Sequence, residues 1–465
     1  MTTALFAADA LLPDGWARDV LVEWDDAGTI VAVRAGVAQA ASCVPRARGP
    51  LLPGMPNLHS HAFQRAFAGL TEHAAGKGQD SFWTWRALMY RFAGRLGPDQ
   101  LETIAAWLYT EMLLAGYTSV CEFHYLHHDP DGRPYAQPAE MSLALLRAAR
   151  RAGIGFTLLP VLYQCGDFGA APPGAGQRRF LHGTEAMLRL LETLAPSCAA
   201  QDAVLGLAPH SLRAVPPPAL RDAVAGLTAL RGDAPIHIHI AEQRREVQAC
   251  LAWCGQRPVA WLLDHLPVDA RWCLVHATHM DEQEYARAAA TGAVAGLCPS
   301  TEANLGDGLF DYPRWRTHGG RWGIGSDSHV CVSAAEELML LEYGQRLRLQ
   351  ARNVGATARH PQVATAMTLA AAAGGAQASG RRAAGLMPGQ RADFIVLDDR
   401  HVALRGLDAP SMLAAHIFAS QRASAIDAVW VDGRQVVEQG RHALQAPARD
   451  DFVAVRRRLL DDCGS

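Results

Sequence analysis

The stretch LLPGMPNLHSHAFQRAFAGL, residues 51–70, contains the pattern on which the interpretation of the whole chain depends. It opens with an apolar run and a Pro-Gly turn, and it then carries His59-Ser60-His61. Side chains alternate across a β-strand, so histidines two residues apart point to the same side. At a strand end both imidazoles can reach one metal ion, at the distance of about 2.0–2.1 Å that zinc takes to nitrogen. Because His-x-His pairs also occur in ordinary strands and loops, the rest of the chain has to supply the missing ligands.

Length and composition limit the class of protein. At 465 residues the chain predicts a large domain plus a smaller one. A formal net charge of -3 without a clustered basic run argues against a nucleic-acid or anionic-membrane surface. The chain lacks an apolar run of about 18 residues, and its first residues lack the basic leader of a secretory signal. We therefore expect a cytoplasmic protein with reduced cysteines, and neither nucleic acid nor a membrane as its partner.

Both ends of the chain carry short strand patterns in which apolar and polar residues alternate. These patterns include an Asp-Gly hairpin motif at residues 432–433. A sheet built from both termini, with a large insertion between them, explains this distribution. We therefore predict a small β-sandwich domain formed by residues 1–52 and 385–445, and a C-terminal helix over residues 446–465.

Between the two ends, residues 53–384 alternate strand-like runs with longer helical ones. The strand candidates are residues 118–125, 155–163, 203–211, 235–241, 273–277, 292–300 and 322–329. Repeated strand–helix units predict a parallel sheet with right-handed crossovers. About eight such units predict an α/β fold with a TIM-like (β/α)8 catalytic barrel. A doubly wound open sheet is the alternative, although no G-x-G-x-x-G dinucleotide motif follows the first strands.

Polar residues lie where the predicted strands end. Barrels gather their reactive groups at the carboxyl ends of the strands, so we expect these side chains at one mouth. They are His59, His61, His124, Tyr125, His210, His239, His276 and Asp327. Within residues 235–241, His239 is nearer the strand end than His237, which we expect to be an interior histidine. A turn or a helix cap is the ordinary alternative for Asp327.

Three histidines and one carboxylate would form a nitrogen and oxygen site for zinc or another divalent ion, with one position open for water. Zinc lowers the pKa of bound water towards about 7, which makes hydroxide available at neutral pH. Glu242 follows His239 by three residues and is placed to enter the same cavity. Asp327 lies among small residues that allow close backbone approach.

The first stretch, together with SFWTWRALMY, TSVCEFHYLHH, LAPHSLRAV, HIHIAEQ and GIGSDSH, resembles the amidohydrolase superfamily and, within it, the formimidoylglutamate deiminase family of bacterial histidine degradation. The likeness covers nearly the whole chain. It implies one zinc ion per subunit, held by His59, His61, His239 and Asp327, with Glu242, His276 and Asp327 in catalysis. Binuclear relatives bridge two metals with a modified lysine inside the barrel. The only lysine here, Lys77, lies in a polar, glycine-rich segment, which favours one metal.

The resemblance implies zinc-dependent hydrolysis of N-formimino-L-glutamate to N-formyl-L-glutamate and ammonia. A small-molecule substrate with two carboxylates needs fixed cations and hydroxyl donors, and the planar fork of arginine suits a carboxylate. The substrate-binding residues that the resemblance implies are Gln64, Arg86, Tyr125, His210 and Arg213. A surface salt bridge is the alternative for Arg86 and Arg213, and a helix cap is the alternative for Gln64.

Several alternatives stay open at this point. Another deaminase of the superfamily, acting on guanine, cytosine or a triazine, would use the same metal frame, and a non-catalytic barrel would keep only the fold. His124, His127 and His128 form either a second metal site or a solvated loop in which Tyr125 is the useful residue. Residues 72–86 form a lid, a loop that reaches a neighbouring subunit, or aromatic packing on the barrel rim. Similar barrels often pair, so we expect a homodimer.

Overall fold

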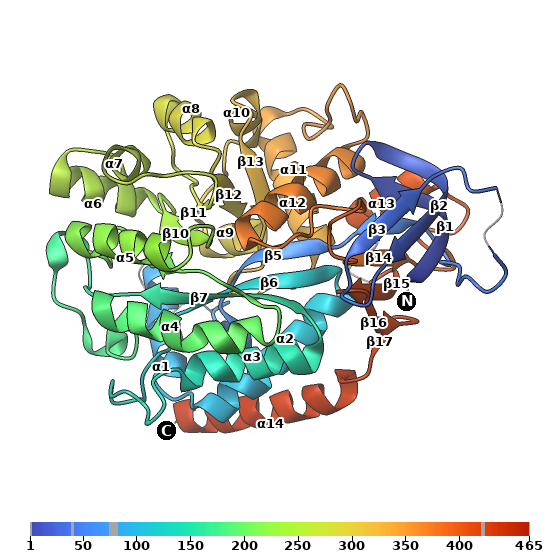
Figure 1. The fold of residues 1–465 in the computed structure, drawn as a ribbon. Coiled ribbons are helices and arrows are strands. Elements are labelled where there is room, and N and C mark those ends of the chain that lie inside the picture. Colours follow the sequence, from blue (N-terminus) through green and yellow to red (C-terminus); the bar gives the residue numbers. More distant parts are fainter. Residues whose placement is uncertain (1, 39–40, 74–81, 420–423, 465) are drawn as a thin grey trace.

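The chain folds into a (β/α)8 barrel that is joined to a domain of β-strands from both termini (Figure 1). The structure is a computed structural model, and it describes residues 2–38, 41–73, 82–419 and 424–464. Within these ranges no helix is both long and apolar enough to cross a membrane. The order of strands and helices confirms the α/β class and the barrel that the alternating sequence pattern predicts.

Eight strand positions form the barrel wall. In chain order they are β5 (Met55–Ser60), β6 (Tyr117–His124), β7 (Gly155–Leu162), the short segments β8 (Val204–Leu205) and β9 (Ala208–Pro209), β10 (Ile236–Ile240), β11 (Trp272–His276), β12 (Val294–Leu297) and β13 (Arg321–Ile324). Their ladders are parallel. A bridge between Ser211 and His239 joins β9 to β10, and the ring closes where Ser60 pairs with Asp327. The strands are buried on both faces, as continuous apolar runs in a parallel sheet predict.

Helices follow the strands and cover the barrel (Figure 1). They are η1 (Ala62–Phe67), α1 (Phe82–Ala93), α2 (Pro98–Leu114), α3 (Glu140–Ala152), η2 (Phe168–Ala170), η3 (Ala175–Gln177), α4 (Thr184–Ala199), α5 (Pro217–Leu230), α6 (Arg244–Cys254), α7 (Pro258–His265), α8 (Glu282–Ala290), α9 (Pro299–Leu305), α10 (Tyr312–Thr317), α11 (Ala334–Leu349), α12 (Val363–Ser379), α13 (Ala409–Phe418) and α14 (Gln445–Gly464). In α3 the buried side includes Met141, Leu145 and Ala149, which are four residues apart on one helix face. The helix ends at Gly153, whose φ of 72° gives a left-handed cap.

The remaining strands form one eight-stranded sheet in the order β17-β16-β15-β14-β4-β1-β2-β3. They are β1 (Thr3–Leu12), β2 (Gly15–Trp24), β3 (Ile30–Arg34), β4 (Leu51–Pro53), β14 (Phe394–Leu397), β15 (Ile426–Val431), β16 (Arg434–Glu438) and β17 (Arg441–His442). Strand β4 pairs with both β1 and β14, so the two ends of the chain meet immediately before the first barrel strand. The hairpin predicted at Asp432 and Gly433 joins β15 to β16, and both residues have positive φ.

Candidate active site

The first and last barrel strands meet at the mouth of the barrel. The backbone N–H of Asp327 donates to the carbonyl of His59 at 3.0 Å, and the N–H of His61 donates to the carbonyl of Asp327 at 3.3 Å. Gly325 allows this approach, because a β-carbon there would lie 2.8 Å from the backbone nitrogen of His59. The small residues before Asp327 therefore have the role expected of them, and they bring both ends of the barrel sequence to one point.

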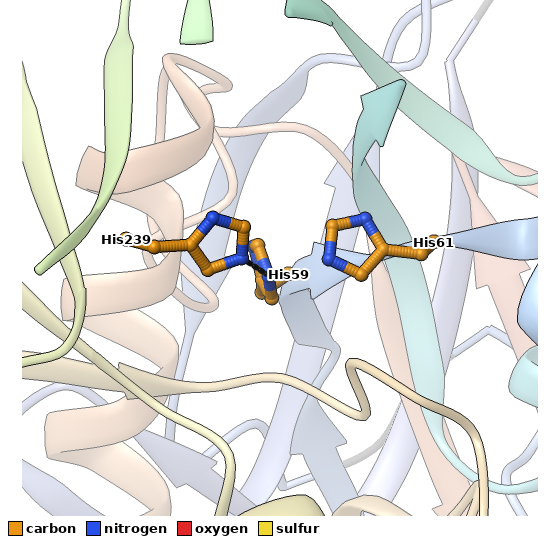
Figure 2. Close-up of side chains that lie close together, drawn as sticks. All are labelled: His59, His61 and His239. Carbon is orange, nitrogen blue, oxygen red and sulfur yellow. Dashed lines mark hydrogen bonds between the residues drawn. The ribbon is translucent and has the colours of Figure 1, made fainter. Parts of the chain in front are cut away.

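Three imidazoles and one carboxylate converge at this point, and Figure 2 shows the rings of His59, His61 and His239 close together. Nε2 of His59 lies 3.0 Å from Nε2 of His239. Oδ1 of Asp327 lies 3.5 Å from Nε2 of His59 and 3.3 Å from Nε2 of His61. Nitrogens that share one tetrahedral zinc ion, each about 2.0–2.1 Å from it, are about 3.3 Å apart. The spacing of the four side chains therefore fits a single ion.

Backbone carbonyls orient two of the three rings. Nδ1 of His61 donates to the carbonyl of Phe123 at 2.8 Å, and Nδ1 of His239 donates to that of His210 at 3.0 Å. With the proton on Nδ1, the lone pair of Nε2 faces the proposed ion. Burial lowers the pKa of His61 to about 3, and burial together with the neighbouring histidines lowers the pKa of His59 and His239 well below the ordinary value. Neutral imidazoles with one carboxylate are a suitable donor set for a divalent transition metal.

Glu242, His276 and Asp327 surround the space beside these ligands. Nε2 of His276 lies 3.8 Å from Oε1 of Glu242 and 3.8 Å from Oδ2 of Asp327. These separations are longer than hydrogen bonds and leave room for a reacting atom. On its other side, Nδ1 of His276 donates to Oε1 of Glu302 at 3.2 Å. A proton on Nε2 would therefore point towards the space between the two carboxylates.

The charges around His276 favour its protonated form. Burial acts to lower the pKa of His276, but the carboxylates of Glu242, Glu302 and Asp327 outweigh it and raise the pKa to about 10. Burial raises the pKa of Asp327 to about 7, although His276 acts in the opposite direction. The mouth of the barrel therefore holds a cationic imidazole between buried carboxyl groups.

A cavity opens above this cluster. It is lined by His61, Gln64, Trp85, Arg86, Met89, Tyr90, Tyr125, Tyr163, Phe180, His210, Arg213, His239, Glu242, His276, Leu305 and Asp327. Every residue predicted to bind metal or substrate or to act in catalysis lines it except His59, which is fully buried; His124, also expected at the mouth, does not line it. The structure therefore brings the predicted metal, catalytic and substrate-binding residues to one place.

Polar and aromatic side chains line the rest of the cavity. Nε2 of Gln64 donates to the hydroxyl of Tyr125 at 2.9 Å, so Gln64 faces the cavity and does not cap a helix. Arg213 is 7% exposed, with Nη2 3.8 Å from Oε2 of Glu242 and Nε 3.9 Å from Oε1 of Glu246. The surface salt bridge considered for Arg213 is therefore wrong, because its charged partners are buried with it. Arg86 reaches the cavity from α1.

Three buried residues that the sequence analysis did not single out support the candidate ligands. Oε2 of Glu122 accepts from Oγ of Ser60 at 2.6 Å, and Oε1 accepts from the N–H of Ala62 at 2.7 Å, so Glu122 holds the His-x-His turn. Nε2 of His329 accepts from the backbone N–H of His61 at 3.3 Å. Oε1 of Glu302 accepts from Nδ1 of His276. A carboxylate two residues before His124 in a buried strand could have indicated Glu122. No pattern in the sequence indicates Glu302 on α9.

Strained backbone gathers at the same mouth. The non-glycine residues with left-handed φ of 44–67° at or next to the site are Ala241, His276, Ala277, Asp327 and His329. Each costs on the order of 1 kcal/mol or more relative to ordinary backbone. Such strain persists only where the surrounding structure imposes it, and its concentration here favours a functional site.

Other predicted histidines have different partners. His237 faces the barrel interior and its Nε2 donates to the carbonyl of Ala378 at 2.8 Å, as expected. Nε2 of His127 and of His128 donate to the carbonyls of Val161 and Leu181 at 2.9 and 2.8 Å. Among the described residues, no group of converging metal-binding side chains includes His124, His127 or His128. The structure therefore does not support a second metal site there. It also corrects the solvated-loop alternative, because His124 and His127 are buried.

The segment considered as a lid can be followed only in part. Residues 74–81, which include Lys77, lie outside the described residues. Beyond them, the ring of Trp85 lies 6.0 Å from that of Phe67, on η1. This contact agrees with aromatic packing on the barrel rim, and the lid and neighbouring-subunit interpretations stay predictions.

Comparison with known proteins identifies relatives along the whole chain. Residues 51–436 match the Amidohydrolase family, and residues 2–42 match the domain described as "Formimidoylglutamate deiminase HutF, N-terminal domain". The chain is 52% identical over 459 residues to a formimidoylglutamate deiminase of Pseudomonas aeruginosa, covering 99% of this chain and 100% of that one. An amidohydrolase from Brucella melitensis has a crystal structure with a TM-score of 0.92 and 46% identity, covering 98% and 100% of the two chains. An adenosine deaminase from Xanthomonas campestris, solved with bound zinc, shares the fold at 22% identity, with a TM-score of 0.77 and 98% of each chain covered.

The metal site can be tested by exchanging two histidines of the same strand. In His239→Gln the imidazole that faces the proposed ion is lost, and we expect the metal content to fall at least about tenfold. In the control His237→Gln, the altered side chain points to the carbonyl of Ala378, and the metal content should stay at the wild-type value. Elemental analysis of both purified variants, with circular dichroism to check folding, measures this. Equal metal contents in the two variants would contradict the assignment.

Proposed function

The chain belongs to the amidohydrolase family, and we propose that it hydrolyses the formimino group of N-formimino-L-glutamate to give N-formyl-L-glutamate and ammonia, a step of histidine degradation. The observation that carries this proposal is that the His-Asp cluster and two arginines line the same cavity. The amidine of this linear substrate suits the His-Asp cluster, and its two carboxylates suit the arginines. Full-length identity to a formimidoylglutamate deiminase supports the same substrate.

We propose that the cluster at the mouth is a metal site, in which His59, His61, His239 and Asp327 hold one zinc ion. When bound, the ion supplies Lewis-acid chemistry that lowers the pKa of water towards about 7. A single ion is favoured because the only lysine of the chain, Lys77, lies in a polar, glycine-rich segment. The residues that the structure describes include no lysine that could bridge a second ion.

Three side chains would then move protons and stabilise charge. Asp327 accepts the proton of the attacking water, because it borders both the ligand histidines and the space beside His276. Glu242 delivers one proton to the substrate nitrogen, and the proton that Asp327 took from water supplies the second, so the nitrogen leaves as ammonia. The carbon keeps the oxygen of water, whose remaining proton returns to Glu242. His276 donates from Nε2 to the oxygen on which negative charge develops. Glu302 supports this role, because it accepts the Nδ1 proton and so keeps the imidazole oriented.

Other residues of the cavity lining would bind the two carboxylates. Arg213 and Arg86 supply the cations, and the buried guanidinium of Arg213 can donate two parallel bonds to one carboxylate. Tyr125, held by Gln64, and His210 supply further polar groups. A purine or triazine base carries no carboxylate for these arginines, so the lining favours the linear substrate over a flat aromatic one.

We further propose that the protein acts as a homodimer in the cytoplasm. Nine of its cysteines are described, and each is a free thiol, which suits a reducing compartment. Similar barrels often pair, which supports the dimer.

The substrate can be tested by measuring ammonia release from N-formimino-L-glutamate, N-formimino-L-glutamine and guanine with zinc-loaded protein. We expect turnover of the glutamate compound. The glutamine analogue should have a kcat/KM roughly 100-fold lower, because a buried arginine loses its charged partner. Guanine should release no ammonia. Preference for guanine, or no turnover of the glutamate compound, would reject the proposal.

The proton role of Glu242 can be separated from metal binding. Glu242→Gln keeps the shape of the side chain but removes its titratable proton, so kcat should fall by about 10²–10⁴-fold with an unchanged metal content. The control Glu192→Gln changes an exposed residue of α4 and should leave kcat unaltered. Assays of ammonia release with elemental analysis measure both quantities. A near-normal kcat in Glu242→Gln would remove this residue from the reaction.

The carboxylate role of Arg213 predicts a change in affinity. Arg213→Met retains an apolar stem but loses the guanidinium, and KM should rise at least about 30-fold with a smaller effect on kcat. Arg150→Met, on the exposed face of α3, is the matched control and should keep the wild-type KM. Steady-state kinetics over a range of substrate concentrations measure the difference. An unchanged KM would exclude Arg213 from the binding of the substrate carboxylates.

A further inference from the structure

One buried cation beside the cavity has no part in the reaction described above. Arg179 is 1% exposed, and burial lowers the pKa of its guanidinium. Its Nε donates to the carbonyl of His128 at 2.8 Å, Nη2 donates to that of Leu96 at 2.7 Å, and Nη1 donates to that of Ala93. Within the described ranges no carboxylate forms an ion pair with it. Nη2 also donates to the hydroxyl of Tyr135 at 3.5 Å, and the carboxylate of Asp129 partly offsets the effect of burial on the pKa. A buried charge whose hydrogen bonds go only to neutral oxygens is costly, which indicates that these contacts serve another purpose.

One of the three carbonyls belongs to the end of a helix that lines the cavity, and a second lies shortly after it. Ala93 is the last residue of α1, and Leu96 follows three residues later. The last carbonyls of a helix lack partners within it, and a cationic side chain both satisfies them and complements the helix dipole. The same helix carries Arg86, Met89 and Tyr90 into the cavity. Arg179 therefore fixes the carboxyl end of the element that presents Arg86.

The backbone of Arg179 holds a second wall of the cavity. Its carbonyl accepts from the N–H of His127 at 3.1 Å and from that of His128 at 3.2 Å. These residues belong to the loop that follows β6, in which Tyr125 lines the cavity. Arg179 thus joins α1 to the loop after β6 through both its side chain and its main chain.

The neighbouring Phe180 packs between the aromatic rings that these elements contribute. Its ring centroid lies 5.0 Å from that of Tyr125, 5.7 Å from that of Tyr163 and 5.8 Å from that of Tyr90. The three walls that carry Tyr90, Tyr125 and Tyr163 therefore meet at Phe180. Arg179, the preceding residue, forms hydrogen bonds to two of these walls. Arg179 itself does not line the cavity, so any effect on the substrate must pass through these walls.

We propose that Arg179 is a positioning residue for substrate affinity, which holds α1 so that Arg86 faces a carboxylate of the substrate. The proposal rests on the proposed function, because it assigns a carboxylate to Arg86. The planar fork of the guanidinium reaches three carbonyls in different directions, and the single ammonium of lysine does not reproduce that geometry. Arg179 acts on binding and not on the reacting atoms.

The test compares Arg179→Met and Arg179→Lys with Arg178→Met, which changes the adjacent, exposed arginine. We expect Arg179→Met to raise KM for N-formimino-L-glutamate at least about tenfold, because Arg86 is displaced, while kcat stays within about threefold. Arg179→Lys should lie between this variant and the wild type, and Arg178→Met should match the wild type. An equal loss of kcat and kcat/KM, or an unchanged KM, would overturn the proposal.

A double-mutant cycle shows whether the effect passes through Arg86. If it does, adding Arg179→Met to Arg86→Met should raise KM much less than the same substitution raises it in the wild type, because the displaced group is already absent. Fully additive effects on KM would mean that Arg179 acts by some other route, and would overturn the proposed coupling.

Hydrogen exchange tests the positioning without any substrate. Amides of residues 85–96 should exchange faster in Arg179→Met than in the wild type or in Arg178→Met. If the protein released no ammonia from N-formimino-L-glutamate, the proposed function would fail, and unchanged exchange in this segment would separately refute the positioning. If Arg179→Met does not fold, Arg179→Lys decides the matter, since wild-type KM and exchange in that variant would contradict the need for the guanidinium fork.

Discussion

Backbone pairing between the first and the last barrel strand is the constraint on which the candidate active site depends. The N–H of Asp327 and the carbonyl of His59 form one hydrogen bond, and this bond places a carboxylate beside two imidazoles from the opposite end of the barrel sequence. Close approach requires Gly325 and a left-handed backbone at Asp327. The imidazoles and the carboxylate come from separate strands, so they converge only when the barrel is closed. No local segment of the chain could bring them together. The strain at the mouth is retained because this closure imposes it.

The cavity holds charged groups of both signs. Near the histidines, buried carboxyl groups surround His276, and the lining also includes the guanidinium groups of Arg86 and Arg213. Burying several ionised groups is costly unless each has partners, and here Glu242 lies 3.8 Å from both Arg213 and His276, which in turn lies 3.8 Å from Asp327. Residues further out, such as Glu302 and Glu122, accept hydrogen bonds that fix these groups in place. Charged groups of both signs suit a substrate that carries an amidine and two carboxylates.

Much of this arrangement could be predicted from sequence periodicity. Alternation along residues 235–241 separated His239 from His237, and the structure places the first in the cluster and the second against the carbonyl of Ala378. Strand ends and small residues likewise predicted Asp327. What could not be predicted depends on contacts between distant loops. Glu302 and Arg179 lie in segments without a periodic pattern, and their roles follow from carbonyls and imidazoles contributed by other elements. The first residues of the loop after β6 are buried, although the histidines and the aspartate of this segment resemble a solvated polar turn.

The meeting of β4 with β14 and of β5 with β13 has a consequence for biosynthesis. A ribosome releases His59 and His61 long before the strands that complete the ring, so the emerging polypeptide carries exposed strand edges for most of translation. Contacts of such large sequence separation form slowly, and partly closed barrels are vulnerable to aggregation. The side chains proposed to hold a metal ion therefore converge only at the end of folding, once the far side of the ring has arrived.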